Sequence, residues 1–80
     1  MRLPRDLTGA HLISVLGKLG YVATRQSGSH VRLTTDQPAQ HHITVPLHDP
    51  LRVGTLAAIL AEVAQVHSIS RDELLQVLFG

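Results

Sequence analysis

Apolar residues recur along the chain with two different periods, and each period predicts a different kind of element. A first helix is predicted after Thr8, a residue suited to capping, and before Gly20, which suits the end of a helix. The helical spacing of its apolar stripe is set by Leu12, Val15, Leu16 and Leu19.

Alternating apolar and polar residues then predict three short strands, at residues 21–26, 30–35 and 41–45. The first two flank Ser27-Gly28, a dipeptide typical of turns, and Pro46 closes the third. We therefore expect a hairpin followed by a further antiparallel strand.

The helical period returns in the last third of the chain. Its apolar stripe is formed by Leu56, Ile59, Leu60 and Val63. Ser70 and Glu73 have the spacing of a capping box that opens a last short helix. The order α-β-β-β-α-α predicts an α+β fold in one domain, residues 1–80, with a three-stranded antiparallel sheet, helices on one face and the other face open.

The open face is predicted to carry a cationic site at the tip of the hairpin. A turn centred on Ser27-Gly28 places Arg25 directly opposite His30, and it also places Ala23 opposite Arg32. The expected core face carries Val22, Val31 and Leu33, and the open face carries Tyr21, Arg25, His30 and Arg32. Two arginines around an imidazole suit a phosphate held beside a general base, although solvated surface residues would give the same pattern.

Composition narrows the classes of function. The chain has 80 residues, 44% of them hydrophobic, and no cysteine, which excludes a disulfide scaffold and thiol chemistry. Its single Tyr and single Phe disfavour RNA reading by base stacking, and its net charge of +1 requires any anion site to be local. No segment has the pattern of a signal peptide or a membrane span, so we expect a cytoplasmic protein that does not bind membranes.

Several segments together resemble the HicA toxins of toxin–antitoxin pairs, a family of mRNA interferases. These are "LTGAHLISVLGKLGY" near the N-terminus, the Gly28-Ser29-His30 tripeptide, "ITVPLHDPLRVGTLAAIL" from Ile43 to Leu60, and the closing "SRDELLQVL". The resemblance implies a fold like the double-stranded-RNA-binding domain and endoribonuclease activity on messenger RNA. It implies that His30 is catalytic, and that a HicB-type antitoxin covers the site.

The remaining histidines need separate interpretations. His48 matches a histidine of the family's motif; it would contact phosphate, supply a second proton-transfer group or, as we favour slightly, brace the loop after the third strand. His41 is expected partly in the core and His42 on the open face, while His11 and His67 are expected at the surface. Because His41 and His42 point to opposite faces, a metal site is not predicted.

Three hypotheses follow from these observations. The first is an endoribonuclease toxin that needs no metal or other cofactor, with His30 as acid or base. Its RNA-binding candidates are Arg25, Arg32, Gly28, Ser29 and His48. The second is a module of the same fold that binds RNA without cutting it, and the third is a protein whose open sheet docks a protein partner. We expect a monomer when the chain is free and a heteromeric complex with the antitoxin.

Overall fold

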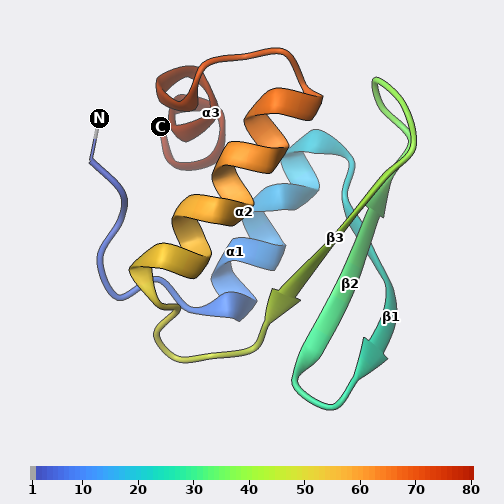
Figure 1. Ribbon diagram of the computed structural model, residues 1–80, viewed down its shortest axis with the longest axis vertical. Coiled ribbons are helices and arrows are strands. Elements are labelled where there is room, and N and C mark those ends of the chain that lie inside the picture. The colour runs from blue at the N-terminus through green and yellow to red at the C-terminus, as the bar shows by residue number, and fades with distance from the viewer. Residues whose placement is uncertain (1) are drawn as a thin grey trace.

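The computed structural model describes residues 2–80, and its elements follow the order that the hydrophobic pattern predicts (Figure 1). They are α1 (Gly9–Leu16), a 3₁₀ turn (Gly17–Leu19), β1 (Val22–Ser27), β2 (His30–Thr35), β3 (His41–Pro46), α2 (Val53–Val66) and α3 (Arg71–Phe79). The predicted α+β class with a three-stranded antiparallel sheet is confirmed.

The residues predicted to begin and end helices do so. The Thr8 hydroxyl caps α1 by accepting a hydrogen bond of 3.0 Å from the His11 backbone N–H. Gly20 ends the 3₁₀ turn with a φ of 83°, a left-handed conformation that glycine adopts without strain. At the start of α3, the Glu73 N–H donates to Ser70 Oγ and the Ser70 N–H donates to Glu73 Oε1, which completes the capping box.

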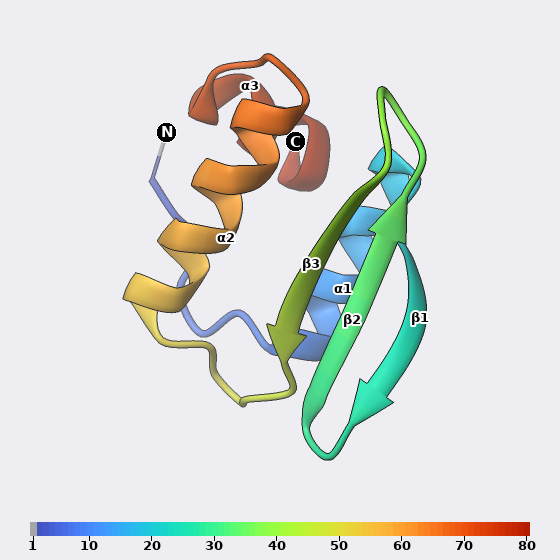
Figure 2. The same ribbon diagram turned by 45° about the vertical axis from the view of Figure 1, so that its right-hand side comes forward.

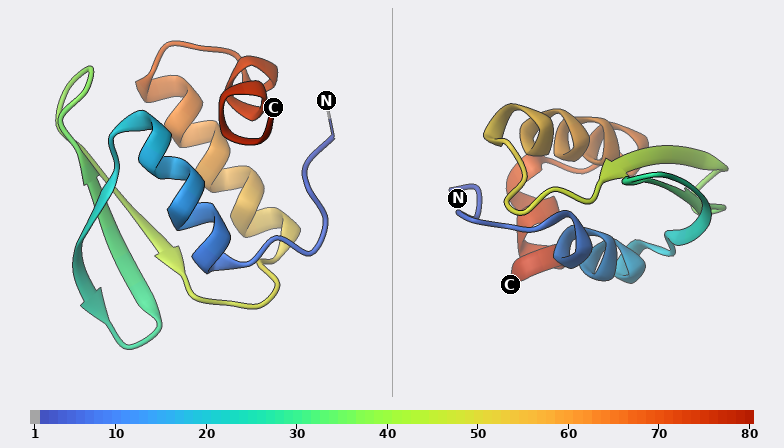
Figure 3. Two further views of the ribbon diagram at one scale, coloured as in Figure 1. Left: turned by 180° about the vertical axis from the view of Figure 1, so that it is seen from behind. Right: turned by 90° about the horizontal axis from the view of Figure 1, so that it is seen from below.

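The sheet has the strand order β1-β2-β3, so β1 and β3 are its edges. α1 lies behind the sheet, and α2 runs beside the β3 edge (Figures 1 and 2). Seen from behind, α1 and α2 run side by side, and α3 packs against them on the side away from the sheet (Figure 3). The side chains of β2 and β3 that face the helices are buried: Val31, Leu33, Thr35, Ile43 and Val45. The opposite face of the sheet is open.

An irregularity in β1 overturns two of the predicted positions. The β1–β2 ladder shifts register between Ala23 and Arg25, which makes a β-bulge at Thr24. One extra residue exchanges the two faces of the strand that precedes it. Tyr21, predicted on the open face, is therefore buried with 3% of its surface exposed, and Val22, predicted in the core, is 60% exposed.

Within residues 2–80, no single helix is both long and apolar enough to cross a membrane. α2 and α3 reach that length and composition only when taken together, as a pair bent by 103°. Their apolar side chains, among them Leu60, Val63, Leu74 and Leu75, are buried in the core.

Candidate active site on the open face of the sheet

His30 is the first residue of β2 and follows directly after a two-residue turn. Ser27 and His30 are paired across the hairpin, which leaves Gly28 and Ser29 as the turn. Gly28 has a φ of 58°, and a tight hairpin turn favours glycine at such a position because a Cβ would be strained there. The turn thus presents His30, whose side chain is exposed, at one end of the open face.

The register differs from the one predicted. Arg25 lies opposite Arg32, not opposite His30, and His30 lies opposite Ser27; the predicted pairing of Ala23 with Arg32 is also wrong. The reason is that the turn is Gly28-Ser29 instead of Ser27-Gly28, which shifts the pairing by two residues. A shift of two keeps every side chain on its face, because strand residues alternate with a period of two.

The open face accordingly brings the predicted cationic residues together. A hollow of about 330 Å³ is lined by Arg25, Ser27, His30, Arg32 and Thr44. It has no acidic residue in its wall, and neither arginine forms an ion pair with another residue in the described part of the chain. Two guanidinium groups free to donate in pairs to an anion, beside an imidazole, suit a phosphate group.

His48 approaches His30 from the segment that follows β3. Pro46 pairs with His30, and the next residue, Leu47, donates its backbone N–H to the Ser29 carbonyl oxygen at 2.6 Å. The two imidazole rings consequently lie with their centroids 6.5 Å apart and their planes at 71°. The His48 backbone carbonyl accepts a hydrogen bond that braces the loop, and its ring lies beside that of His30, so the role of the imidazole stays a prediction.

Gly9 holds this segment in place, and the sequence pattern did not single it out. Its backbone N–H donates to the His48 carbonyl oxygen at 2.9 Å. A Cβ at Gly9 would overlap the Pro46 carbonyl oxygen, so the N-terminus of α1 packs against the end of β3 without room for a side chain. The only sequence signal is a glycine at the first position of a predicted helix, where it is a poor helix former.

The other histidines fall mostly where the pattern places them. His42 is exposed on the open face, His11 is exposed on α1, and His41 is mostly buried, with 14% of its side chain exposed. The prediction for His67 is wrong: it is half-buried, and its Nε2 lies 3.1 Å from the Tyr21 hydroxyl oxygen. Tyr21 reaches His67 because the bulge turns it into the core.

Four polar side chains from separate segments form a continuous hydrogen-bonded chain. The Tyr21 hydroxyl lies 2.7 Å from His41 Nδ1, and His41 Nε2 lies 2.7 Å from Glu62 Oε2. Burial, reinforced by Glu62, raises the pKa of Tyr21 to about 12. Burial, reinforced by His41, lowers the pKa of His67 below its ordinary value of 6.5.

No group of three or more His, Asp, Glu or Cys side chains in residues 2–80 is arranged to hold a metal ion. His41 and His42 are adjacent on β3 and point to opposite faces, as expected from the alternation of a strand. The acid–base candidates around the hollow at the hairpin tip are His30 and, beside it, His48, and no carboxylate lines this hollow.

Comparison with known proteins gives a family match that spans most of these elements. The family model described as the HicA toxin of bacterial toxin–antitoxin systems matches residues 9–65, well over half of the 80-residue chain. The matched range contains α1, the whole sheet and α2 except its last residue. No curated protein and no solved structure matches the chain, so the likeness to the double-stranded-RNA-binding domain stays a prediction.

Proposed function

The chain belongs to the HicA toxin family of bacterial toxin–antitoxin systems, and we propose that it acts as an endoribonuclease that cuts messenger RNA without a metal. The observation that carries this proposal is the placement of His30. Its imidazole lies in a hollow with two arginines that form no ion pair within residues 2–80, and the centroid of a second histidine ring, that of His48, is 6.5 Å away.

RNA brings its own nucleophile to such a site. The 2′-oxygen attacks the neighbouring phosphorus, a P–O2′ bond forms and the P–O5′ bond breaks, which leaves a 2′,3′-cyclic phosphate and a free 5′-hydroxyl. One proton must leave the 2′-oxygen and one must reach the 5′-oxygen. A well-placed general base or acid accelerates such a step by roughly 10²–10⁴-fold.

In this mechanism His30 and His48 share the two proton transfers. The entering and leaving oxygens lie on opposite sides of the phosphorus, so a phosphate between two imidazoles can exchange a proton with each. Arg25 and Arg32 donate hydrogen bonds to the non-bridging oxygens, where negative charge accumulates as the bond to O2′ forms. Gly28 and Ser29 form the turn that sets the position of His30 and border the path of the RNA.

We expect a HicB-type antitoxin to neutralise the toxin by covering the open face, because this face carries His30 and both arginines of the proposed reaction. The site of action is the cytoplasm, where messenger RNA is translated. A partner that covers His30 and both arginines blocks proton transfer and phosphate binding at once.

The test is cleavage of a single-stranded RNA by the purified protein in EDTA, beside a His30→Ala variant. We expect the wild-type protein to cut and the variant to lose at least about 10²-fold in rate. His11→Ala is the matched control, because His11 is an exposed histidine on α1, next to Phe79, outside the open face.

Each alternative outcome has a separate meaning. Equal cleavage by wild type and His30→Ala would contradict the role of His30. RNA retention without cleavage, weakening steeply with salt, would favour a non-catalytic RNA-binding module. An absence of any RNA interaction would favour a sheet that docks only proteins.

A further inference from the structure

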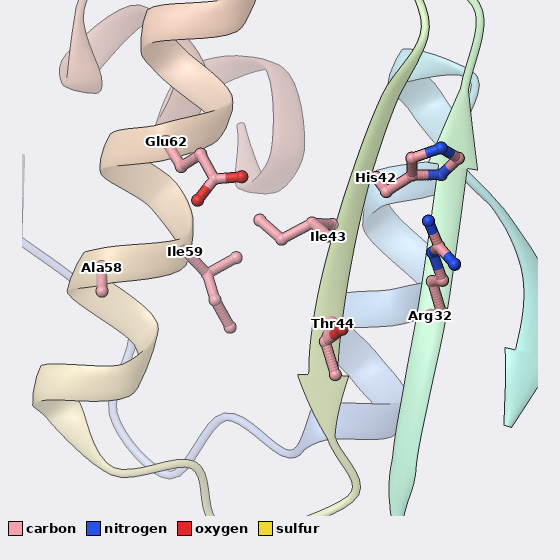
Figure 4. Close-up of a pocket in the computed structure, with 7 residues that line it drawn as sticks. All are labelled: Arg32, His42, Ile43, Thr44, Ala58, Ile59 and Glu62. Atoms are coloured by element: carbon pink, nitrogen blue, oxygen red, sulfur yellow. The ribbon is translucent and has the colours of Figure 1, made fainter. Parts of the chain in front are cut away.

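A second, larger hollow continues the open face toward α2. It has a volume of about 510 Å³ and lies between the open face, contributed by Arg32, His42 and Thr44, and the helix, contributed by Ala58, Ile59 and Glu62 (Figure 4). Such a volume is within the range of small-molecule sites, roughly 300–1,000 Å³.

This hollow is joined to the one around His30. Arg32 and Thr44 are paired across β2 and β3, and both line the two hollows. Alternate residues of a strand are about 7 Å apart, so Arg32 lies about 7 Å along β2 from His30. Thr34 is the next residue of β2 on this face, and it is paired with His42 of β3. A strand of RNA whose phosphate is bound by Arg32 next to His30 would therefore place a neighbouring nucleoside over the larger hollow.

The walls of the larger hollow differ chemically from those around His30. Ile43 and Ile59 point toward each other between β3 and α2 and give it an apolar floor (Figure 4). Glu62 adds a carboxylate, which repels a phosphate group. The hollow thus suits an uncharged group with an apolar surface. In a nucleotide, the base has these properties and the phosphate does not.

A planar ring at the rim, that of His42, can stack on such a base, and the phosphate-binding Arg32 lies beside it. The His42 imidazole and the Arg32 guanidinium lie next to each other on the open face (Figure 4). His42 Nδ1 is 2.8 Å from the Thr34 hydroxyl, which anchors the ring. Proteins stack unpaired RNA bases on aromatic rings, histidine included, and on arginine planes, so the lack of Tyr or Phe here does not preclude stacking.

Glu62 supplies the selective contact. Its Oε2 lies 2.7 Å from His41 Nε2, which holds the carboxylate in place, and each carboxylate oxygen can accept a further hydrogen bond. A carboxylate accepts from N–H groups of a base. Guanine offers two adjacent N–H donors on its Watson–Crick edge, and the other bases offer fewer.

Resting on the proposed ribonuclease function, we propose that the hollow between β3 and α2 is a nucleobase-binding subsite. It holds the base next to the cleaved phosphate, with Glu62 selecting guanine and His42 stacking on it, while Arg32 binds the phosphate.

Two variants test the subsite without touching His30 or His48. Glu62→Gln keeps an oxygen for His41 but turns an amide NH₂ toward the base, so the preference for guanine should fall about tenfold or more. Ala58→Leu fills the hollow from an exposed helical position and should exclude the base. The matched controls are Asp36→Asn, an exposed acid in the β2–β3 loop, and Ala61→Leu, an exposed alanine of α2 outside the hollow.

The first readout is the sequence at the cut ends of a random single-stranded RNA pool. We expect the wild type and both controls to prefer guanine at one position beside the cut, and Glu62→Gln to lose that preference. A wild type that cuts without base preference, or a Glu62→Gln variant with an unchanged preference, would overturn the subsite.

The second readout does not depend on cleavage. Guanosine 3′- and 5′-monophosphates are titrated into wild type and His30→Ala while backbone amide shifts are followed by NMR, with adenosine and uridine monophosphates for comparison. We expect shifts at Ile59 and Glu62 that are strongest for guanosine and weakened about tenfold or more in Glu62→Gln. Binding without cleavage would refute the ribonuclease and retain the subsite; the absence of shifts at these residues with all nucleotides would refute the subsite itself.

Discussion

The proposed cleavage needs two proton transfers, and one imidazole exchanges only one proton at a time. The cleavage rate therefore depends on which group beside His30 carries the other proton. The ring of His48 is the nearest candidate, 6.5 Å away between centroids. The bracing of this segment is carried by backbone atoms, namely the His48 carbonyl and the Leu47 N–H, which any residue type would supply. The imidazole of His48 is therefore not needed to hold the loop, and its chemistry can be tested separately.

We predict that His48→Asn lowers the cleavage rate by about 10²-fold while the protein remains folded. The variant keeps His30 but lacks the second proton-transfer group of the proposed reaction. The measurement is the cleavage rate of both proteins on the same single-stranded RNA.

The stability of His48→Asn is the control, since an exposed side chain is expected to change the free energy of unfolding by no more than about 0.5 kcal/mol. An unchanged cleavage rate in a folded His48→Asn variant would show that the second proton passes through another group.

At the scale of the elements, the β1–β2 hairpin shows what an alternating pattern can determine. The pattern predicts which side chains share a face, and it placed Arg25, His30 and Arg32 together correctly although the register was wrong by two residues. It cannot reveal a bulge, because one unpaired residue such as Thr24 needs no special side chain, and so the faces of Tyr21 and Val22 were exchanged.

The helices were easier to predict, because their caps at Thr8, Gly20 and Ser70 act locally along the chain. The approach of His48 to His30 could not be derived from spacing, since it depends on contacts between β3, the hairpin turn and α1. The hollow between β3 and α2 could not be derived from spacing either, because it depends on how two elements distant in the sequence pack together.

The contact between α1 and the end of β3 gives a prediction for two glycines in the first turns of helices. Gly9→Ala should lower the free energy of unfolding by about 1–3 kcal/mol, because the new Cβ overlaps the Pro46 carbonyl oxygen and forces backbone apart. Gly54→Ala in α2 meets nothing within 4 Å and should stabilise the protein by up to about 1 kcal/mol. Urea unfolding followed by circular dichroism measures both.

The cleavage rate of Gly9→Ala should fall by more than the loss of folded protein explains. The reason is that the new Cβ shifts the segment after β3, which carries His48. Equal stability of the two alanine variants would mean that α1 does not pack against β3 as closely as described.

At the scale of the whole molecule, the chain of Tyr21, His41, Glu62 and His67 connects segments that are far apart in the sequence. Tyr21 precedes β1, His41 begins β3, Glu62 lies in α2, and His67 follows α2. One assignment with neutral rings satisfies every contact: His67 Nε2–H donates to the Tyr21 oxygen, Tyr21 O–H donates to His41 Nδ1, and His41 Nε2–H donates to Glu62. This polar chain joins the sheet to the helical layer at one end.

The protonation of this chain predicts how stability depends on pH. The pKa of His67 is lower in the folded protein than its unfolded value of 6.5, so the unfolded chain binds the proton first as the pH falls. The free energy of unfolding should therefore decrease as the pH drops below about 6.5. The pKa of Tyr21 rises from 10.0 to about 12, so the unfolded chain loses its proton first, and stability should also decrease between pH 10 and 12.

Two variants separate these contributions in urea unfolding measured across the pH range. His67→Gln should reduce the acid loss, and Tyr21→Phe should remove the alkaline loss at a cost of about 1 kcal/mol at neutral pH, because it breaks the hydrogen bonds to both histidines. The variant His11→Ala, at an exposed position, should leave the loss of stability at acid pH and at alkaline pH unchanged. An alkaline loss of the same size in Tyr21→Phe would show that another group titrates there, and that Tyr21 does not hold the two layers together through its phenol.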